Sequence, residues 1–392
     1  MSKLDRWLLP DGIEEMLPQE ASRVEALRRR LVDGFRCWGY DYVIPPMVEF
    51  TDSLLTGSGG DIELLTFKVT DQLSGKTMGV RADITPQAAR MDAHSLQREG
   101  VNRLCYAGHV LHARPKVPLA SRTPIWVGVE LFGEAGIEAD IEVVSLLLDT
   151  LKTAGLPQYI DIGHVGIFRA LATATGLNSE QEEQLFTLLQ AKATTDIQKW
   201  AEANIADKQQ RAWIIELPKL SGSVAILEKA KSVLTSAPAE VFIALDELGQ
   251  LARTVQQRYD DAQIHFDLSE LRGYHYHTGI VFGAFTPGEG EAIANGGRYD
   301  HIGEAFGRRR PATGFSANLS VISRVLQEQI NTVYGIFAPV TKSASQWQKI
   351  AALRAQGERV IVGFTAQQQP LDYQNCNRLL VERDGEFIVE NI

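Results

Sequence analysis

Two strand-rich parts of this sequence enclose a long segment that shows only helical periodicity. Short apolar runs typical of strands lie at 101–111, 125–132, 264–268, 280–285 and 291–294. Between the second and third runs, residues 165–260 repeat apolar positions at helical spacing and contain few strand signals. Consecutive strands that pair with one another, with helices segregated around them, form an antiparallel α+β arrangement. The sequence therefore predicts the α+β class, with a helical insertion at 165–260.

Helical spacing also predicts a helix over residues 21–38, where Val24, Leu27, Leu31 and Phe35 share one face. A strand is expected to follow at 40–44, ended by two prolines. A second helix is predicted over 139–154, and a strand-turn-helix over 312–329. The polar loop at 112–124, between two predicted strands, is long enough to suggest a functional role.

The chain is expected to divide near residue 330. Residues 1–330 contain the predicted sheet and its helical insertion. The remaining segment, 331–392, has short strand candidates at 359–364 and 387–389, which predict a small α/β unit.

Composition limits the classes of partner and compartment. The 392 residues carry 39 basic and 49 acidic side chains, a net charge of -10, which argues against a protein that grips tRNA through a basic surface. The three cysteines are far apart and form no metal-binding pair, as expected in a reducing compartment. No apolar run is long enough to span a bilayer, and acidic residues interrupt the N-terminal apolar run. We therefore expect a cytoplasmic protein.

Two short segments gather groups that suit a small zwitterion. Residues 271–279 read Leu-Arg-Gly-Tyr-His-Tyr-His-Thr-Gly, and residues 295–300 read Asn-Gly-Gly-Arg-Tyr-Asp. Arginine binds a carboxylate through a planar fork, and glycines let a ligand approach the backbone closely. His275 and His277 are expected to share one face of a strand, but no third metal ligand has suitable spacing, so no metal site is predicted.

These segments resemble the two histidine-recognition motifs of histidyl-tRNA synthetases. Residues 39–49 resemble motif 1 of class II synthetases, a dimer-interface element, and residues 129–133 resemble the part of motif 2 whose glutamate pairs with the imidazole. Residues 81–86 resemble the segment that binds the amino group of histidine. For that last segment, a helix start with Thr85 as N-cap and Pro86 at N1 is an alternative or additional interpretation. The implied fold is a class II synthetase-like antiparallel sheet flanked by helices.

The resemblance implies a pocket for L-histidine. In it, Glu130 would pair with the imidazole, Arg272 with the carboxylate and Asp83 with the ammonium group. The residues expected to line this pocket are Asp83, Thr85, Glu130, Arg272, Tyr276, His277 and Tyr299. The competing interpretation is an inherited structural ion-pair network that binds nothing.

The groups that would bind ATP depart from the synthetase pattern. His112 stands at the place of the motif 2 arginine, with Arg114 as a substitute only if the loop changes register. Val321 replaces the motif 3 arginine, Ser320 its neighbouring glutamate, and Trp126 a glutamine near the amino acid. Adenylate formation depends on positive charge around the phosphates, and a neutral imidazole is a poor replacement for a guanidinium group. No catalytic residue and no cofactor are therefore predicted.

This combination is similar to a non-catalytic branch of the family, the ATP phosphoribosyltransferase regulatory subunits. The segment 331–392 is too short and too neutral for the anticodon-binding domain that it would replace. The resemblance implies a dimer-forming protein that joins a short-form catalytic subunit in a hetero-octamer, activates it, and confers feedback inhibition by histidine. The alternative is a divergent enzyme that adenylates histidine, and a tRNA-binding decoy is disfavoured by the net charge.

Overall fold

A nine-stranded sheet organises the larger of two units in the computed structural model. The structure describes residues 7–57, 60–117, 120–326, 334–340, 343–365 and 375–392. The first unit spans Met1–Leu326 and the second Gln327–Ile392. In spatial order the strands are β1 (Asp41–Tyr42), β5 (Asn102–His109), β6 (Ile125–Phe132), β12 (Ala312–Asn318), β11 (Ala294–Arg298), β10 (Ile280–Phe285), β7 (Tyr159–His164), β9 (Gln263–Asp267) and β8 (Ser221–Gly222).

The predicted α+β class is confirmed, although the sheet is mixed rather than wholly antiparallel. The β1–β5 and β7–β9 pairs run parallel, and all the other neighbouring strands run antiparallel. A parallel pair needs a long crossover connection. The helical segment supplies this connection between β7 and β9.

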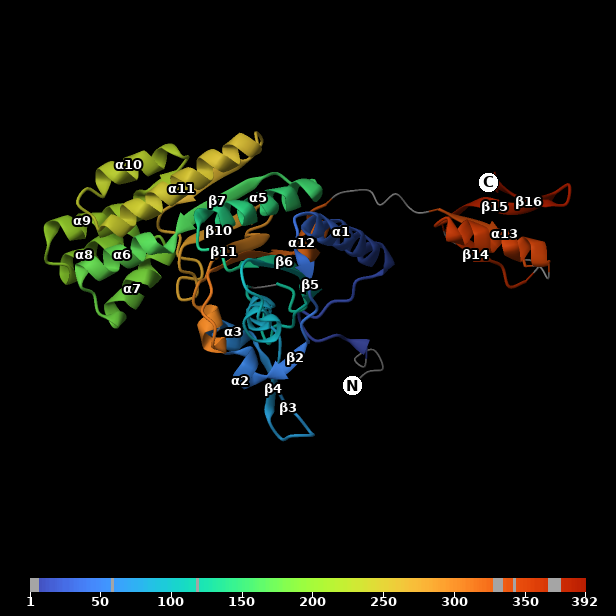
Figure 1. Ribbon diagram of the computed structural model, residues 1–392, viewed down its shortest axis with the longest axis horizontal. Helices are drawn as coiled ribbons and strands as arrows, with labels where there is room; N and C mark the ends of the chain where they lie inside the picture. The colour runs from blue at the N-terminus through green and yellow to red at the C-terminus, as the bar shows by residue number, and fades with distance from the viewer. Residues whose placement is uncertain (1–6, 58–59, 118–119, 327–333, 341–342, 366–374) are drawn as a thin grey trace. The chain divides into compact units, whose positions relative to one another are not determined.

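Three helices pack against one another on one face of this sheet (Figure 1). They are α1 (Pro18–Cys37), α5 (Ile137–Thr153) and α12 (Leu319–Val325). Helix α1 starts earlier than predicted because Pro18 occupies its first turn, where a missing N–H is harmless. Only Asp41 and Tyr42 of the predicted strand 40–44 form a strand.

Side chains alternate between the two faces of the sheet, and the two faces carry different clusters of residues. On β6, Val127, Val129 and Leu131 are buried in the core shared with α1 and α5. The intervening residues, including Glu130, therefore point to the opposite face. That face carries a second, smaller apolar cluster, which includes Tyr106 and Tyr299.

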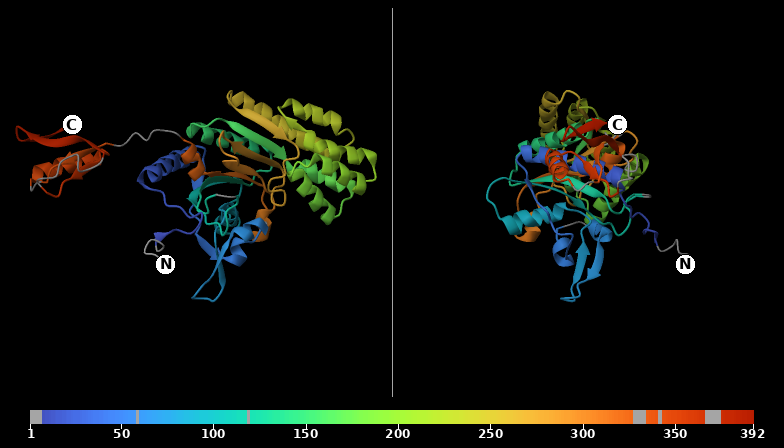
Figure 2. Two further views of the ribbon diagram at one scale, coloured as in Figure 1. Left: turned by 180° about the vertical axis from the view of Figure 1, so that it is seen from behind. Right: turned by 90° about the vertical axis from the view of Figure 1, so that its right-hand side faces the viewer.

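The helical segment lies at one end of the sheet, beside β7 (Figures 1 and 2). It consists of α6 (Val165–Thr175), α7 (Ser179–Gln190), α8 (Thr194–Asn204), α9 (Lys208–Glu216), the 3-10 turn η3 (Leu217–Lys219), α10 (Ala225–Val233) and α11 (Ala239–Arg258). Helix α11 packs on both α5 and α6, which fixes the segment to the sheet layer. A capping box at Asn178 and Gln181 starts α7.

A small three-stranded sheet forms a separate layer of the first unit. Its strands are β2 (Val48–Phe50), β4 (Thr77–Val80) and β3 (Phe67–Thr70), with the short helices α2 (Thr51–Leu54) and α3 (Gly60–Leu65) nearby (Figure 1). The chain then forms α4 (Thr85–Arg90) and a π-helical turn, η2 (Met91–Leu96), before it enters β5. Residues 302–306 form a further 3-10 turn, η4.

The strand predicted at 291–294 lies further along the chain, at Ala294–Arg298. Gly296 and Gly297, predicted from the sequence to let a ligand approach the backbone, belong to this strand. In the structure a side chain at Gly296 would begin 2.3 Å from the Gly314 carbonyl oxygen. These glycines are in the strand because the backbones there are too close for any other residue.

The second unit is a four-stranded sheet with one helix. Its order is β14 (Val360–Val362), β13 (Gly335–Ala338), β15 (Cys376–Arg383) and β16 (Glu386–Asn391), and α13 (Ala344–Ala355) packs on it. The sequence analysis predicted β14 and β16 but missed β13 and β15. Residues 327–333, which include the end of the predicted helix and the start of the predicted tail, lie outside the described residues.

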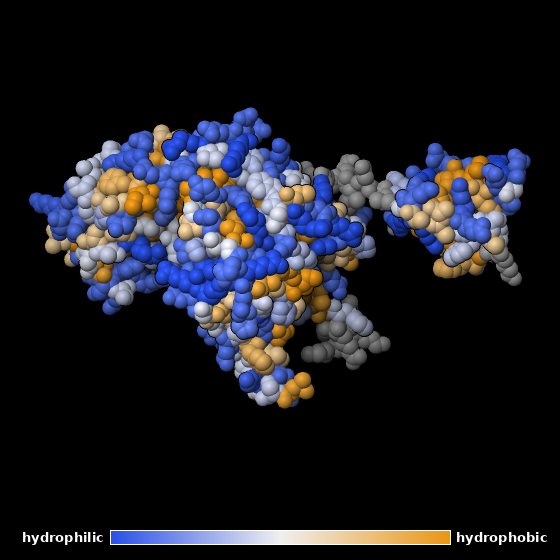
Figure 3. Space-filling model, viewed as in Figure 1, coloured by the Kyte–Doolittle hydropathy of each residue, from blue (hydrophilic) through white to orange (hydrophobic). Residues whose placement is uncertain are grey.

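Hydrophilic residues cover most of the visible face of the first unit, and apolar residues gather there only in small areas (Figure 3). No helix within the described residues is long and apolar enough to cross a membrane. Among the described residues of the first unit, two ion pairs are buried, Arg310–Asp92 and Arg298–Asp140. In the second, Arg298 Nε and Nη2 donate to Asp140 Oδ2 at 2.9 and 2.6 Å. Both side chains are buried, and Arg298 also bonds the carbonyl oxygens of Glu134 and Gly136.

Replacing Arg298 should destabilise the first unit strongly. Arg298→Ala leaves the Asp140 carboxylate buried without its cation, and we expect the free energy of unfolding to fall by about 3–5 kcal/mol. Urea denaturation followed by circular dichroism measures this change. Arg29→Ala is the control, because the exposed Arg29–Glu25 pair should contribute less than about 1 kcal/mol. Equal losses in the two variants would contradict the assignment of Arg298 as a structural anchor.

Candidate functional site

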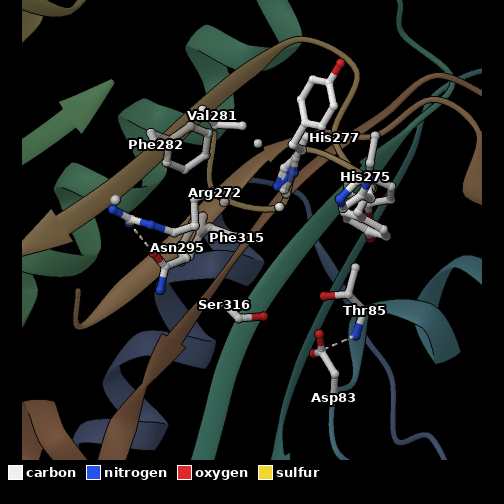
Figure 4. Close-up of a pocket in the computed structure, with 18 of the residues that line it drawn as sticks. Asp83, Thr85, Arg272, His275, His277, Val281, Phe282, Asn295, Phe315 and Ser316 are labelled. Carbon is white, nitrogen blue, oxygen red and sulfur yellow. Dashed lines mark hydrogen bonds between the residues drawn. The ribbon is translucent and has the colours of Figure 1, made fainter. Parts of the chain in front are cut away.

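A cavity of about 700 Å³ lies on the face of the sheet opposite α1 and α5. Its lining includes all seven residues predicted from the sequence, namely Asp83, Thr85, Glu130, Arg272, Tyr276, His277 and Tyr299. They come from four parts of the chain: the start of α4, strand β6, the turn at 271–277, and the residue after β11. Figure 4 shows four of them, Asp83, Thr85, Arg272 and His277, around the opening between the strands.

Glu130 is the most deeply buried charged group of this cavity, with only 1% of its surface exposed. Tyr106 donates its hydroxyl to Glu130 Oε1 at 3.1 Å, and Tyr299 donates to Oε2. Burial raises the pKa of Glu130 to about 8 despite these bonds, because the charged form loses its hydration. The described residues form no ion pair with Glu130. Its carboxyl group can therefore donate a hydrogen bond to a polar ring when it is protonated, or accept one when it is ionised.

Room for Glu130 comes from a glycine on the neighbouring strand. Gly314 of β12 is the direct partner of Glu130 in the sheet. A side chain at Gly314 would begin 1.9 Å from Glu130 Oε2 and would also press on the backbone of Val129. The carboxyl group can therefore occupy this position only opposite a residue without Cβ.

Tyr106 connects Glu130 to two hydroxyl groups. Its hydroxyl lies 2.6 Å from Ser316 Oγ and 3.2 Å from Thr85 Oγ1. Burial raises its pKa well above the ordinary value, so the phenol keeps its proton. Tyr106 and Ser316 were not predicted as site residues, although both lie in segments that resemble motifs 2 and 3 of the synthetases. Alternation along the predicted strand could have placed Tyr106 on one face, but nothing in the sequence shows which face the cavity occupies.

Asp83 and Thr85 stand at the start of α4. Asp83 Oδ1 accepts the backbone N–H groups of Ile84 at 2.6 Å and Thr85 at 3.3 Å. The sequence interpretation of Thr85 as the N-cap is therefore wrong, since Thr85 is the first helical residue and turns its hydroxyl toward Tyr106. The second carboxylate oxygen of Asp83 has no hydrogen bond in the described part of the chain, and a cationic group in the cavity can approach it.

Arg272 reaches the cavity from the turn that precedes β10. Its Nη1 donates to Asn295 Oδ1 at 2.6 Å, and its Nη2 donates to Glu270 Oε2 at 3.0 Å (Figure 4 shows the bond to Asn295). A side chain at Gly283 would begin 2.4 Å from Nη1, so this glycine makes room for the guanidinium group. About 39% of the side chain is exposed, and each terminal nitrogen has a further N–H to offer an anion.

Tyr276 and His277 bring two unsatisfied polar atoms to the cavity. The Tyr276 hydroxyl and His277 Nδ1 are buried, and neither has a hydrogen-bond partner in the described part of the chain. The Tyr276 ring stacks on Tyr299 with 4.9 Å between ring centres. Burial, with a contribution from Arg169, lowers the pKa of His277 to about 3, so its imidazole is neutral. Buried polar atoms without partners are costly and are expected where a ligand can satisfy them.

Some sequence expectations for these segments are wrong. Residues 271–277 form turns and not a strand, so His275 and His277 do not share a strand face. His275 is exposed beside Glu183, and His277 is half-buried, with its Nδ1 atom inside the protein. The described residues contain no group of three potential metal ligands. Arg298 bonds Asp140 outside this cavity, whereas Asn295, Gly296, Gly297 and Tyr299 of the segment 295–300 line it.

The residues at the departures from the synthetase pattern have structural roles. His112 is buried and donates from Nε2 to the Ala82 carbonyl oxygen at 3.1 Å, and burial lowers its pKa to about 4. Ser320 Oγ accepts the backbone N–H of Ile125, while Val321 packs against the core. Trp126 lines the cavity, with the Lys116 ammonium group 5.5 Å from its ring centre.

Comparisons of sequence agree with this geometry over the whole chain. A family model described as histidyl-tRNA synthetase matches residues 12–322, and one described as the ATP phosphoribosyltransferase subunit HisZ C-terminal domain matches residues 333–390. A protein of Teredinibacter turnerae is 66% identical and one of Saccharophagus degradans 62% identical, and each match covers 100% of both chains. Both relatives bear the name ATP phosphoribosyltransferase regulatory subunit.

Solved structures with the same fold carry both names. A protein from Bacillus halodurans, described as an ATP phosphoribosyltransferase regulatory subunit/histidyl-tRNA synthetase, superposes with a TM-score of 0.83 at 26% identity, covering 95% of this chain and 96% of its own. A histidyl-tRNA synthetase from Nostoc has a TM-score of 0.79 at 18% identity, covering 98% and 97%. The second likeness bears on the fold alone, and it confirms the predicted class II synthetase-like core.

Replacing Glu130 with glutamine should stabilise the protein in a pH-dependent way. The folded pKa of about 8 lies above the ordinary value of 4.5, so the native protein holds a proton that the unfolded chain releases between these values. The stability of the wild type therefore falls as the pH rises through this window, by at most about 1.4 kcal/mol per pH unit. Glutamine does not titrate, and we expect Glu130→Gln to be more stable by on the order of 3 kcal/mol at pH 7.

Thermal and urea unfolding of both proteins, from pH 4 to pH 8, checks this expectation. The difference between the two proteins should grow with pH. A difference that stays constant across the range would mean that Glu130 does not keep its proton in the folded state.

Proposed function

The chain belongs to the family of ATP phosphoribosyltransferase regulatory subunits, and on this premise we propose that its cavity binds L-histidine and thereby controls the catalytic partner. The chain is a regulatory subunit of the ATP phosphoribosyltransferase of histidine biosynthesis, and such a subunit implies a catalytic chain with which it assembles. The proposal is that it activates this chain and makes it sensitive to feedback inhibition by histidine.

The arrangement of charges carries the proposal. Glu130 is a proton-holding carboxyl group at the closed end of the cavity, suited to a ring nitrogen. Arg272 offers unused N–H groups to a carboxylate, and Asp83 offers an oxygen to an ammonium group. A zwitterion with a basic ring matches all three groups, and few other metabolites do.

The unsatisfied atoms point in the same direction. The Tyr276 hydroxyl and His277 Nδ1 lose hydration on folding and gain no partner among the described residues. A buried polar group without a partner costs about 1–3 kcal/mol. A polar ligand that bonds either atom regains part of this cost, which adds to its affinity.

The competing interpretation, a structural ion-pair network, has less support. In such a network the charged residues would neutralise one another. Arg272 pairs with Glu270, and the described residues form no ion pair with Glu130 or Asp83. The three groups that face the ligand position are therefore not engaged with each other.

We also propose that the chain is not itself an enzyme. Its His112, at the place of the motif 2 arginine, is buried and neutral and is bonded to backbone, and Val321 has no charge to offer a phosphate. The alternative function, adenylation of histidine, needs cations at these places. We propose no cofactor for either role.

The assembly is proposed from the family resemblance. Two copies of the chain would associate through residues 39–49, which resemble the class II dimer element. The dimers would join short-form catalytic subunits in a hetero-octamer. The proposed compartment is the cytoplasm, and the acidic net charge of -10 disfavours tRNA as a partner.

Truncation of Glu130 tests the histidine pocket directly. Glu130→Ala removes the carboxyl group that pairs with the ligand ring, so histidine binding should weaken by about 1–3 kcal/mol. Assembly with the catalytic subunit should persist, because Glu130 lies inside this chain. Isothermal titration calorimetry measures the affinity, and size-exclusion chromatography measures assembly.

Glu142→Ala is the matched control. The Glu142 carboxylate also accepts a tyrosine hydroxyl, from Tyr40, but it is not part of the cavity lining. Its removal should leave histidine affinity unchanged. Wild-type affinity in Glu130→Ala, or lost assembly with binding intact, would refute the assignment of the pocket.

Mixing experiments test the regulatory role. With a short-form catalytic subunit, the chain should raise the rate of phosphoribosyl transfer from phosphoribosyl pyrophosphate to ATP, and histidine should lower that rate. The chain alone should not support histidine-dependent exchange of pyrophosphate into ATP, since it lacks the phosphate-binding arginines. Rapid exchange would favour the adenylating alternative, and an unchanged transfer rate on mixing would contradict the proposed regulation.

A further inference from the structure

The turn Leu271–His277 is shared between the cavity and the helical segment. Arg272, Tyr276 and His277 line the cavity next to the sheet, where they meet Asn295 and Tyr299. Tyr274 and His275 also line the cavity, as do Glu183 and Phe186 of α7, and the two turn residues contact α6 and α7 through their side chains. One short stretch of backbone therefore carries both the side chains that contact the sheet and those that contact the two helices.

Helix α7 holds this turn through Tyr274. The Tyr274 hydroxyl donates to Glu182 Oε1 at 2.5 Å, and its ring packs between Phe168 of α6 and Phe186 of α7, with ring centres 5.2 and 5.6 Å away. His275 adds a contact of 3.4 Å to Glu183. A displacement of the turn must therefore displace the first two turns of α7 as well.

Helix α6 holds the same turn by its backbone. Arg169 Nη2 donates to the carbonyl oxygens of Tyr274 and His277, each at 3.2 Å, and its guanidinium group lies 5.0 Å from the centre of the Tyr274 ring. The residue that Arg169 fixes, His277, is one of the two with an unsatisfied atom in the cavity. The arginine is thus one residue away from the ligand position.

These contacts give a physical route from ligand to helices. A ligand that bonds the Tyr276 hydroxyl or His277 Nδ1 restrains the turn, because it adds a partner where the empty cavity has none. Whatever restrains the turn also restrains the helices that grip it. By thermodynamic linkage, loosening those helices must weaken ligand binding by the same factor.

We propose that α6 and α7 sense occupancy of the cavity through the 271–277 turn and carry this signal into the helical segment. In this scheme Arg169, Glu182 and Tyr274 are positioning residues. The inference rests on the proposed function, since histidine is the ligand assumed, and it deepens that function by naming the route of regulation.

The helical segment is built to pass such a change onward. Trp200 of α8 donates from Nε1 to Gln184 Oε1 of α7 at 3.1 Å, and α6 packs against α9 and α11. A change in the mobility of α6 and α7 can therefore reach three further helices, α8, α9 and α11, without passing through the sheet. We expect the surface of this segment to transmit the effect of the ligand to a partner.

Hydrogen exchange of the full-length chain, with and without histidine, tests the route. Histidine should slow exchange of the α6 and α7 amides in the wild type by about fivefold or more, the lower range of ordinary allosteric coupling. Tyr274→Phe removes the bond to Glu182 and should lose most of this protection. Tyr259→Phe is the matched control, because the Tyr259 hydroxyl bonds the Ser145 carbonyl oxygen between α11 and α5 and does not contact the turn.

Calorimetry on the same samples tests histidine binding separately from the coupling through the turn. If histidine binds the wild type but leaves α6 and α7 exchange unchanged, the coupling is wrong and the histidine pocket stands. If histidine does not bind, both proposals are overturned. Equal loss of protection in Tyr274→Phe and Tyr259→Phe would also overturn the coupling, because it would show a general loosening.

A second pair of variants covers the case in which Tyr274→Phe folds poorly. Glu182→Ala removes the same bond from the α7 side, and Glu180→Ala is its control in the same first helical turn. Both lose one acidic residue near the helix N-terminus, so their effects on helix stability should match. Reduced histidine protection and reduced histidine inhibition in Glu182→Ala alone support the route, and identical behaviour of the pair refutes it.

Discussion

The arrangement of this molecule around its cavity depends on one carboxyl group placed inside a sheet. A fully buried glutamate is costly unless its surroundings offer hydrogen bonds, and here two phenol groups, one on β5 and one directly after β11, supply them. The neighbouring strand β12 must then contribute a glycine, Gly314. The next strand, β11, must end at a point from which the Tyr299 hydroxyl can bond Glu130. Position, room and hydrogen bonding for this single group therefore constrain four strands that are far apart in the sequence.

At three positions that depart from the synthetase pattern, the side chains bond or pack within the protein itself. His112 bonds backbone through Nε2, Ser320 accepts a strand N–H, and Val321 joins the core. Buried atoms without a partner among the described residues occur both there and in the cavity, at His112 Nδ1, the Tyr276 hydroxyl and His277 Nδ1. The two regions differ in charge instead. None of the three positions offers a cation to a phosphate, whereas Arg272 and Asp83 line the cavity beside the buried Glu130.

Motifs predicted the site better than periodicity predicted the strands. Arg272 and Glu130 could be found because their residue types match a ligand chemistry at recognisable spacing. Tyr106 could not, because a tyrosine in an apolar strand has no distinguishing neighbours, and its role appears only when β5 is placed beside β6. Gly296 lay outside the predicted strand, although it belongs to β11. The close approach of β12 that requires a glycine there is a tertiary contact, and strand propensity describes only the local chain.

The glycine opposite Glu130 has a consequence for how sequences of this kind can change. A Cβ at Gly314 would lie 1.9 Å from Glu130 Oε2 and 2.4 Å from the carbonyl oxygen of Val129. A smaller residue at position 130 would remove the first overlap but not the second, because the second involves backbone. Both the carboxyl group and the close approach of β6 and β12 therefore require this glycine. A change at position 130 alone does not free position 314 to vary.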